Sequence, residues 1–441
     1  MSCEIQVGYG RKDIMPIGSI EMGGLGNGPH RKSNNAFDTL FATCIAITDD
    51  RDQTLLVITT DLCHSMQGVT ADARKIITAK TGIPGDHIMI SATHTHAGPD
   101  VWNPGPQTVN DYLEQCAVKI ANAAFAALED RKPARIYTAM KQVSGLNFVR
   151  HYKRADGTCG ATQTPENPWV GHMTEPDTRM RIVLFKREEG KDILMMNWQA
   201  HPCYTADRYD ALDLSADYIS VVRSYLEIML DCKFAFFQGA CGNLVTRSKI
   251  KTEYSEREMV PYGKRLGDEA ISMLSHLKEI QPAPLQFIQR QYPCPVEHST
   301  DVEKEQATEL WNYWLETGDM SKCAPWAAKL GYQSVYVARA VLERLGLPKH
   351  HEIELNAIRL GELAWATVPG EMFDTCGAYV KDNSPVENTI MMPYCNGAYG
   401  YFPTIQAIDY GCYEAATRKY ARGAAEEMAE NLVEMLRELD K

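Results

Sequence analysis

Residues 87–99 read His-Ile-Met-Ile-Ser-Ala-Thr-His-Thr-His-Ala-Gly-Pro and carry the strongest structural signal in the chain. The apolar run 88–92 lies between a Pro-Gly pair and a Gly-Pro pair, which is typical of a short, fully buried strand. His94 and His96 follow this strand. Because side chains two residues apart in an extended chain point the same way, both imidazoles are expected to face one cavity beyond the strand.

A metal site is the function that this histidine pair favours. Neutral imidazole is a common ligand of first-row metals. The alternative is that both are ordinary histidines hydrogen-bonded to backbone groups, which is the usual explanation for a single histidine. Because the pair ends a buried strand and precedes a small-residue turn at 97–99, the metal site is the favoured interpretation.

Alternating strand and helix patterns predict an α/β fold with mixed, largely parallel sheets flanked by helices. Residues 55–60, 69–80 and 87–92 form a βαβ unit whose strands are expected to be parallel. Residues 1–441 are expected to form a single catalytic domain with a mainly helical insertion at about 255–350. Further strands are expected at 135–142, 179–187, 193–198, 234–237, 285–292, 352–359, 363–368 and 389–394, and further helices at 108–130, 215–230, 258–279, 301–317, 323–345 and 412–438.

Several apolar runs end at a Gly- or Pro-containing corner that holds a polar side chain. In open α/β sheets the ligand crevice lies beyond the carboxyl ends of the strands. Chance could place one or two polar residues there, whereas five such corners indicate that they converge in space. The corner residues are Asp61, the pair His94 and His96, His201, Asn243 and Glu371.

Three of these corner residues would suit a catalytic metal ion. A catalytic zinc typically takes three protein ligands from His, Glu or Asp and leaves one position for water, whose pKa falls to roughly 7. His94, His201 and Glu371 would supply such a set. The chain has no H-E-x-x-H helix and no G-x-S-x-G elbow, so neither a standard zinc protease nor an α/β-hydrolase serine mechanism is indicated.

Composition narrows the classes of partner. The chain has 45 basic and 57 acidic residues and a net charge of −12, which argues against nucleic acid or an anionic membrane and leaves a small-molecule substrate. No secretory signal and no run of 18 apolar residues is visible, so we expect a cytoplasmic protein without a membrane span. Whether the protein forms a homo-oligomer is left open.

Cysteine usage and one Gly/Pro-rich segment were considered as further signals of function. The 13 cysteines include no Cys-x-x-Cys pair, and small apolar core residues are favoured over a thiolate nucleophile or a zinc–thiolate site. Residues 16–29 match no phosphate-binding pattern, so a structured loop near the site is expected. Residues 151–177 are polar and are expected to form a long loop with Trp169 as its large anchor.

Several of these segments resemble the neutral/alkaline (non-lysosomal) ceramidase family. They occur in the family's order and cover essentially the whole chain, although only the catalytic domain of the family. The Thr-His-Thr-His-x-Gly-Pro signature is the most specific. The segments are Val-Gly-Tyr-Gly with Asp-Ile-Met-Pro at 7–16, Ser-Ala followed by the signature at 91–99, Asn-Trp-Gln-Ala-His-Pro at 197–202, Phe-Gln-Gly-Ala-Cys-Gly-Asn at 237–243, Pro-Gly-Glu at 369–371, and Tyr-Gly-Tyr at 399–401 with Tyr-Glu at 413–414.

The resemblance implies a metal centre. It implies one zinc ion per chain, bound by His94, His201, Glu371 and Tyr401. Direct coordination would favour the phenolate form of Tyr401, whose ordinary pKa is about 10. His96 would lie beside the metal as a proton carrier or a transition-state partner and not as a ligand.

The resemblance also implies residues that hold the substrate. Tyr413 would donate to the developing oxyanion, and Arg150 would hold a substrate oxygen. Asn147 and Asn243 complete the predicted substrate-binding set. Taken alone, each tyrosine is better explained as a packing residue, since the chain has 21, and Arg150 could equally form a plain salt bridge.

The chain departs from the family at residues 242–247. It reads Gly-Asn-Leu-Val-Thr-Arg where the ceramidases read Gly-Asp-x-Ser-Pro-Asn, so Val245 replaces the serine of the ceramidase site. We expect no counterpart of the family's C-terminal immunoglobulin-like domain or of its export signal. The resemblance therefore implies zinc-dependent cleavage of the C–N (amide) bond of an N-acylated small molecule more directly than it implies ceramide as the substrate.

Two other functions stay open for the same residues. A metal-dependent lyase or isomerase acting on a sugar-like substrate would use the ion to stabilise an enolate or alkoxide, and its product would not gain the mass of water. A non-catalytic zinc-binding or ligand-binding protein on the same scaffold would bind metal without turnover.

Overall fold

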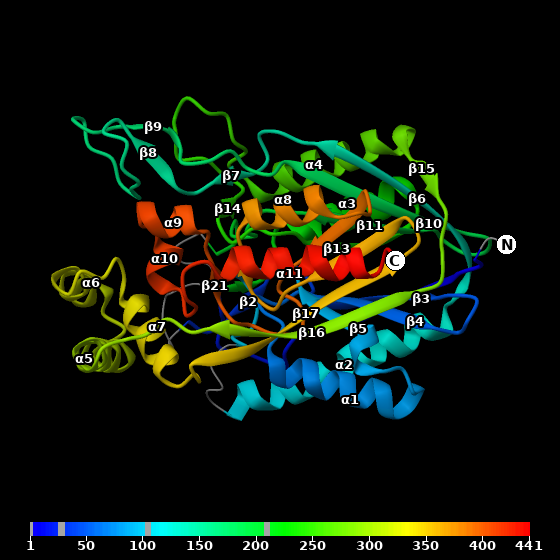
Figure 1. The fold of residues 1–441 in the computed structure, drawn as a ribbon, viewed down its shortest axis with the longest axis horizontal. Coiled ribbons are helices and arrows are strands. Elements are labelled where there is room, and N and C mark those ends of the chain that lie inside the picture. The colour runs from blue at the N-terminus through cyan, green and yellow to red at the C-terminus, as the bar shows by residue number, and fades with distance from the viewer. Residues whose placement is uncertain (1–2, 25–30, 102–106, 207–211) are drawn as a thin grey trace.

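The computed structural model describes residues 3–24, 31–101, 107–206 and 212–441. In these residues two mixed β-sheets pack face to face, and helices cover their outer faces (Figure 1). The predicted α/β class is confirmed. The strand pairing within the sheets is more antiparallel than predicted. Within the described ranges, no helix combines the length and the apolar character that crossing a bilayer requires.

The larger sheet contains the predicted βαβ unit at one edge. Its β4 and β5 are parallel and are joined by α1 (Gln67–Thr81), as the sequence predicts, and β11 and β13 are parallel at the other edge. All other neighbours in this sheet are antiparallel. In spatial order its strands are β13 (Lys233–Gln238), β11 (Ile193–Trp198), β10 (Arg179–Arg187), β6 (Lys132–Gln142), β1 (Gln6–Asp13), β3 (Phe41–Thr48), β4 (Thr54–Thr60) and β5 (Ile88–Ala92), and β15 (Lys278–Ile280) pairs with β6.

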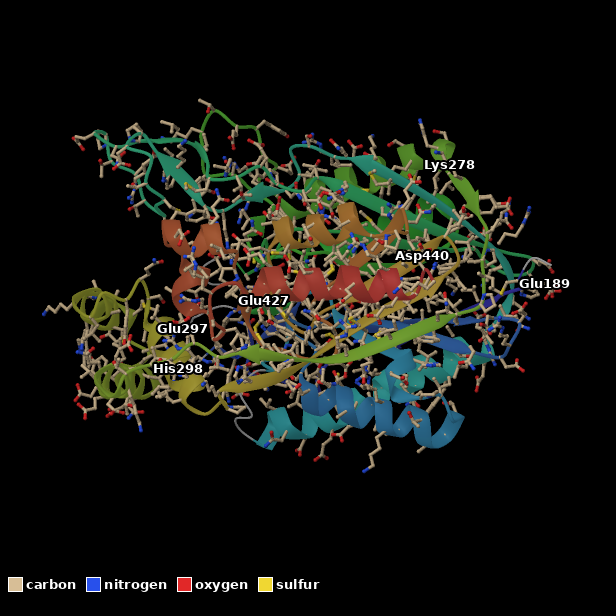
Figure 2. The ribbon with its side chains drawn as sticks, in the orientation of Figure 1. Glu189, Lys278, Glu297, His298, Glu427 and Asp440 are labelled. Atoms are coloured by element: carbon tan, nitrogen blue, oxygen red, sulfur yellow. The ribbon has the colours of Figure 1, made fainter. Side chains whose placement is uncertain are left out.

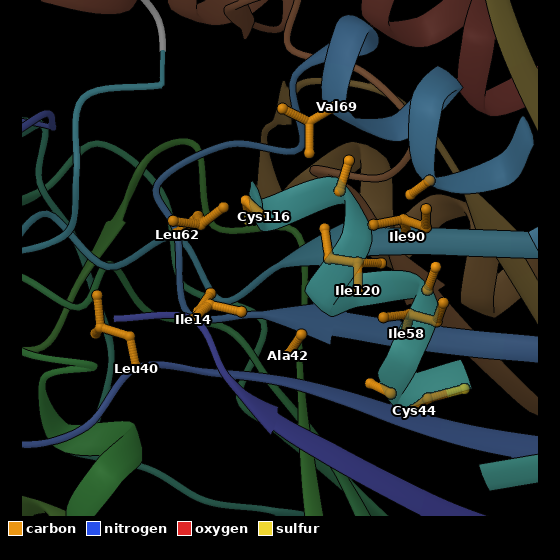
Figure 3. Close-up of a cluster of buried hydrophobic side chains, with 14 of the residues drawn as sticks. Ile14, Leu40, Ala42, Cys44, Ile58, Leu62, Val69, Ile90, Cys116 and Ile120 are labelled. Carbon is orange, nitrogen blue, oxygen red and sulfur yellow. The ribbon is translucent and has the colours of Figure 1, made fainter. Parts of the chain in front are cut away.

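Strands β3, β4 and β5 of the larger sheet are buried along almost their whole length because both faces of the sheet are covered at this edge. In β4, Leu56 and Ile58 face α1 and the long helix α2 (Gln107–Glu129), where Ile58 lies in the cluster drawn in Figure 3. Leu55 and Val57 point the opposite way, into the core shared with the second sheet. Period-two alternation therefore divides the strand between two cores and produces no polar face.

Helix α2 lies unusually close to β1 because two glycines leave room for it. A Cβ atom on Gly8 would lie 2.0 Å from the carbonyl oxygen of Ala127, and one on Gly10 would lie 2.0 Å from that of Ala123. No side chain can occupy such a distance from backbone. These glycines of the Val-Gly-Tyr-Gly segment therefore set the spacing between the helix layer and the sheet.

The second sheet is covered on its outer face by α8 (Asp374–Asn383) and α11 (Ala424–Glu438). Asp440, just beyond α11, accepts a hydrogen bond at 2.7 Å from Arg359, which ties the end of the chain to this sheet (Figure 2). Its strands, in spatial order, are β16 (Gln286–Pro295), β17 (His350–Leu360), β18 (Leu363–Thr367) and β20 (Asn388–Met392).

The predicted helical insertion at 255–350 divides between three parts of the fold. Helix α4 (Met259–Met273) packs with α3 (Tyr218–Leu230) on the larger sheet, while β15 and β16 belong to the two sheets. A separate helical group with its own core lies to one side (Figure 1). It consists of α5 (Asp301–Thr317), α6 (Met320–Lys329) and α7 (Val335–Leu345). The single-domain division of the chain stays a prediction.

Short elements complete the described chain. The predicted loop 151–177 contains a hairpin in which Trp169 stacks on Tyr152 with ring centroids 4.6 Å apart. The predicted last helix, 412–438, is interrupted, so α10 and α11 are separate. The short elements are β2 (Asn35–Ala36) with β12 (Asp213–Leu214), β7 (Phe148–Val149) with β14 (Leu244–Val245), β8 (Tyr152–Arg154) with β9 (Trp169–His172), β19 (Glu371–Met372) with β21 (Tyr401–Phe402), α9 (Ile405–Tyr410), α10 (Tyr413–Thr417), and the 3-10 turns Gly85–His87 and Leu274–His276.

A buried carboxyl at the start of α3 predicts a pH-dependent stability. Burial raises the pKa of Asp217 to about 6, although the backbone N–H groups of Thr205 and Tyr218 donate to it. The unfolded value is about 3.9, so between pH 4 and 6 the folded chain binds more protons than the unfolded chain, and rising pH destabilises the fold. Relative to Asp217→Asn, the free energy of unfolding of the parent should fall by on the order of 2–3 kcal/mol as the pH rises over this range. Above pH 7 the difference in this free energy between the two proteins should be constant.

The measurement is urea unfolding of both proteins at several pH values between 4 and 7. Comparing the two proteins removes the contribution of the carboxylates that they share. A difference that does not change with pH would contradict the raised pKa of Asp217.

Candidate metal centre

The carboxyl ends of β5 and β11 meet, although these strands lie near opposite edges of the larger sheet. Gln238, the last residue of β13, donates from its side-chain amide to the carbonyl oxygens of Thr93 (3.2 Å) and Ala200 (2.9 Å). The residues that follow these two carbonyls are His94 and His201. One buried amide therefore fixes both segments that carry the predicted histidine ligands.

His94, His201 and Glu371 lie together in the interior. One candidate ligand atom from each residue lies within 4.8 Å of the others. The Oε2 atom of Glu371 is 3.2 Å from Nε2 of His94 and 3.5 Å from Nε2 of His201. All three side chains are buried. The predicted convergence of these residues is confirmed, and their role as metal ligands stays a prediction.

The hydrogen bonds of the two imidazoles leave their lone pairs facing Glu371. Nδ1 of His94 donates to the carbonyl oxygen of Cys63 (2.7 Å), and Nδ1 of His201 donates to that of Leu244 (2.9 Å). Because a carbonyl oxygen can only accept, each Nδ1 carries the proton and each Nε2 is an acceptor. Among the described residues, Nε2 of His201 and Oε2 of Glu371 have no hydrogen-bond partner.

Such an arrangement of buried acceptors fits a cation. Unpaired acceptor atoms in the interior are unfavourable unless something compensates them, and two imidazoles with one carboxylate are a donor set used by catalytic zinc. Nδ1–H bonds to backbone carbonyls are also the usual way in which a protein orients its metal-binding histidines. The residues present therefore fit the zinc ion that the sequence predicts.

The environment keeps the histidines neutral, as metal ligation requires. Burial lowers the pKa of His201 to about 4, with a further contribution from the positive charge of Arg150. Burial also holds the pKa of His96 well below its usual range, and His94 and His201 lower it further. At neutral pH the imidazoles of His201 and His96 are therefore uncharged.

His96 lies beside His94, but the geometry that brings them together differs from the predicted one. Their Nε2 atoms are 3.3 Å apart, so the two imidazoles lie together as predicted. The strand ends at Ala92, however, and His94 has a φ of +68°, in the left-handed region. The predicted extended geometry is therefore wrong, because a strained turn, and not strand alternation, places the two rings.

The Gly/Pro-rich segment lies against this turn. A Cβ atom on Gly24, whose φ is +88°, would lie 2.6 Å from Cα of His96, so only glycine fits there. The backbone N–H of Gly23 donates to the carbonyl oxygen of Gly98 at 3.0 Å. The prediction of a structured loop near the site is confirmed up to Gly24, and residues 25–29 lie outside the described residues.

Tyr401 reaches the site through a two-strand pairing. Strands β19 and β21 are parallel, with Glu371 opposite Tyr401. Burial and the Glu371 carboxylate raise the pKa of Tyr401, while Arg150 opposes them. The ring of Tyr413 lies 6.1 Å from that of Tyr401. Although the residue is 38% exposed, desolvation of its hydroxyl raises its pKa to about 12, so Tyr413 is a neutral hydroxyl donor at neutral pH.

Arg150 is held by the protein on two sides. Its Nε donates to Oε1 of Glu414 at 2.5 Å, so the predicted alternative of a salt bridge is present. Its Nη2 donates to the hydroxyl of Tyr401 at 3.2 Å and to the carbonyl oxygen of Gly242 at 2.9 Å. Arg150 therefore contacts one of the predicted ligands directly.

Glu414 and His151 are part of the site, although no role was predicted for either residue. Oε2 of Glu414 is 2.8 Å from Nε2 of His151, whose Nδ1 is 2.7 Å from the hydroxyl of Tyr410. Burial raises the pKa of Glu414, but Arg150 and His151 outweigh it and hold that pKa well below its usual range. The only sequence signal for them was position: His151 follows Arg150 directly, and Glu414 follows Tyr413.

The two predicted asparagine contacts are occupied by the protein itself. Nδ2 of Asn243 donates to Oδ1 of Asp374 (2.7 Å), and its Oδ1 accepts from the N–H of the same residue (2.9 Å). Nδ2 of Asn147 donates to the carbonyl oxygens of Asp177 (2.8 Å) and Gln199 (3.1 Å). Both amides hold neighbouring segments in place, and their contact with substrate stays a prediction.

Asp61 is the corner residue that does not converge on the site. Its carboxylate binds Nη2 of Arg223, at 2.8 and 2.7 Å, and accepts from the N–H of Phe41 at 2.8 Å. The prediction of five converging corners is wrong for Asp61, because a buried arginine on α3 neutralises this carboxylate where it emerges from β4.

The cysteines behave as core residues. None of the 13 is in a disulfide, and all but Cys159 and Cys203 are buried. Cys63 and Cys241 lie near the site, where burial raises the pKa of both thiols and keeps them protonated. The expectation of small apolar core residues therefore holds for these two.

Comparisons with known proteins identify the fold. No protein-family model and no curated protein sequence matches the chain. The crystal structure of neutral ceramidase from Pseudomonas aeruginosa matches it with a TM-score of 0.74 and 16% identity, over 100% of this chain and 75% of that chain. A ceramidase complexed with C2 matches with the same TM-score and identity, over 99% and 75%. The chain therefore has the fold of the neutral ceramidases, as its sequence motifs predict.

Proposed function

We propose that the protein is a zinc-dependent hydrolase that cleaves the C–N (amide) bond of an N-acylated small molecule. The observation that carries this proposal is the buried set of His94, His201 and Glu371, whose acceptor atoms face one another. Nε2 of His201 and Oε2 of Glu371 have no hydrogen-bond partner in the part of the chain that the structure describes. The fold shared with the neutral ceramidases supports amide hydrolysis as the reaction class.

The proposed ligands are His94, His201, Glu371 and Tyr401. When bound, zinc would polarise an acyl carbonyl and lower the pKa of water. His96 would then carry a proton to the leaving amine. Its imidazole is neutral, lies 3.3 Å from His94, and has an Nδ1 atom without a partner among the described residues.

Tyr413 and Arg150 are proposed to bind the reacting acyl group. The protonated hydroxyl of Tyr413 would donate to the oxyanion, and the loss of one such donor typically reduces the rate about 100-fold or more. The Nε and Nη2 atoms of Arg150 are occupied, whereas Nη1 has no hydrogen-bond partner within the described parts of the chain. Nη1 is therefore the atom proposed to hold a substrate oxygen.

The substrate class is proposed more broadly than ceramide. Val245 stands where the ceramidases have a serine, and it forms a parallel bridge with His201. A hydroxyl that could contact substrate is thus missing directly beside a proposed ligand. We therefore propose N-acyl amino acids, N-acyl sugars and short-chain ceramides as the compounds to compare.

Metal removal should abolish the reaction. Dialysis against a zinc chelator is expected to reduce amine release by about 10³-fold or more, because a metal supplies several kcal/mol of transition-state stabilisation. Added zinc should restore the rate. The measurement is amine release from the three compound classes, together with the mass of the products.

The product masses separate the proposed reaction from its alternatives. Hydrolysis adds the mass of one water to the sum of the products, whereas a lyase or isomerase reaction does not. A binding protein without turnover would show no difference between the parent and His96→Ala on any compound. Either of these results would reject the amide hydrolase.

A further inference from the structure

Glu414 is a buried carboxylate that contacts the candidate metal centre only through other residues. It is 1% exposed, and both of its oxygens are engaged. Oε1 accepts from Nε of Arg150 at 2.5 Å, and Oε2 lies 2.8 Å from Nε2 of His151. Its two partners are consecutive residues of the segment that follows β7.

The guanidinium of Arg150 bridges this carboxylate and a proposed ligand. Glu414 holds the Nε edge, while Nη2 reaches the hydroxyl of Tyr401 (3.2 Å) and the carbonyl oxygen of Gly242 (2.9 Å). A planar guanidinium has a fixed fork of donors, so fixing one edge also fixes where the other nitrogens point. Glu414 therefore determines the direction of Nη1, the nitrogen proposed to hold the substrate.

Glu414 also anchors the short helix that carries Tyr413. Helix α10 contains five residues, too few to be stable through its own hydrogen bonds. Tyr413 is 38% exposed, while its neighbour Glu414 is buried and bound on both sides. The carboxylate is thus a fixed point beside the residue proposed to donate to the oxyanion.

We propose that Glu414 is a positioning residue of the site: it orients Arg150 against Tyr401 and holds Tyr413 beside it. This inference rests on the proposed function for its catalytic meaning. Buried ion pairs add little net stability but can specify one geometry, and that is the role assigned to this pair. His151 is held in turn by the hydroxyl of Tyr410 at 2.7 Å, which restricts the carboxylate from its other side.

Glu414→Gln tests the proposal with minimal disturbance of the fold. The amide oxygen of glutamine can still accept from Arg150, and its nitrogen can donate to His151. We expect kcat/KM to fall roughly 10- to 100-fold with zinc content unchanged, because small displacements of a positioning group can reduce rates about 100-fold. Arg150→Lys, which keeps the charge but loses the fork, should give a comparable loss and serves if Glu414→Gln is unstable.

Glu253→Gln is the matched control. Glu253 also pairs with a histidine, His172, at 2.8 Å, and that histidine bonds to the carbonyl oxygen of Val149, next to Arg150. This pair anchors the same segment but does not contact the guanidinium. Its loss should leave kcat/KM within about twofold of the parent, because Glu253 is partly exposed and contacts neither Arg150 nor a proposed ligand.

A double-mutant cycle distinguishes positioning from general stabilisation. If Glu414 acts through Arg150, Glu414→Gln should reduce kcat/KM little further in a protein that already carries Arg150→Met. The proposal would be overturned if the fold-loss in kcat/KM of the double variant equalled the product of the two single losses, since the two residues would then act independently.

A second measurement does not depend on turnover. Acetohydroxamate binds zinc and presents a carbonyl oxygen, and its affinity for the zinc-loaded protein can be measured by calorimetry. We expect roughly tenfold weaker binding in Glu414→Gln and unchanged binding in Glu253→Gln, as for the loss of one oriented hydrogen bond. This pattern without amide hydrolysis in the parent would reject the proposed function and retain the role of Glu414. Hydrolysis and acetohydroxamate affinity at parental levels in Glu414→Gln would reject that role and retain the function.

Discussion

Replacing Glu371 by alanine is expected to release the bound zinc and to reduce amide hydrolysis by about 10³-fold or more. The carboxylate is the anionic member of the buried set, with Oε2 3.2 Å from His94 and 3.5 Å from His201. Its removal would leave two neutral imidazoles and a phenol whose pKa is raised by burial. The measurements are elemental analysis of the purified protein and amine release from the responsive substrate.

Two further variants give this experiment its controls. Glu354→Ala removes a carboxylate that is paired with Arg74 at 2.9 and 3.0 Å, away from the proposed ligands, and should retain zinc. His96→Ala should also retain zinc while losing roughly 10²- to 10⁴-fold in rate, the usual contribution of a proton carrier. Zinc near the parental level in Glu371→Ala would contradict the ligand assignment.

Asp61→Ala is expected to destabilise the fold by about 3–5 kcal/mol without changing the zinc content. Asp61 is 1% exposed, and its partner Arg223 is 5% exposed. Removing the carboxylate would leave a buried guanidinium without its countercharge and the N–H of Phe41 without an acceptor. The free energy of unfolding, measured in urea, reports this loss.

Asp231→Asn is the control for an exposed ion pair, because asparagine removes the charge and still tolerates the left-handed backbone of this residue (φ +48°). Asp231 accepts from Lys191 at 2.5 Å, but both side chains are largely in solvent, where such pairs add little stability. Its replacement should leave the midpoint of the urea transition unchanged. A loss of zinc in Asp61→Ala would contradict the purely structural role of Asp61 and would indicate that it belongs to the metal centre.

Secondary structure was largely predictable because buried positions produce a regular apolar pattern in the local sequence. The run 55–60 begins with four consecutive apolar residues, so apolar side chains point to both faces of the strand. The structure places this run in β4, between two cores. The error lay in strand direction. Antiparallel and parallel strands buried on both faces have the same apolar pattern, so the pattern could not show that most neighbours of β4 and β10 are antiparallel.

The residue types of the candidate site were predictable, whereas their connections were not. His94, His201 and Glu371 could be selected because imidazoles and carboxylates at strand ends are uncommon unless they have a role. Glu414 could not, because a glutamate in a polar stretch is usually in solvent. Its burial depends on Arg150 and His151, which lie 264 and 263 residues away along the chain.

By itself the sequence determined the strands, the helices and the chemical types of the candidate ligands, since these follow from local periodicity and from the chemistry of each side chain. Only the tertiary structure decided which corners meet. Gln238 holds the segments after β5 and β11 together, whereas Asp61 forms an ion pair with Arg223 away from the site. The physical reason is that buried polar groups must find partners, and those partners are chosen by the packing of distant segments and not by spacing along the chain.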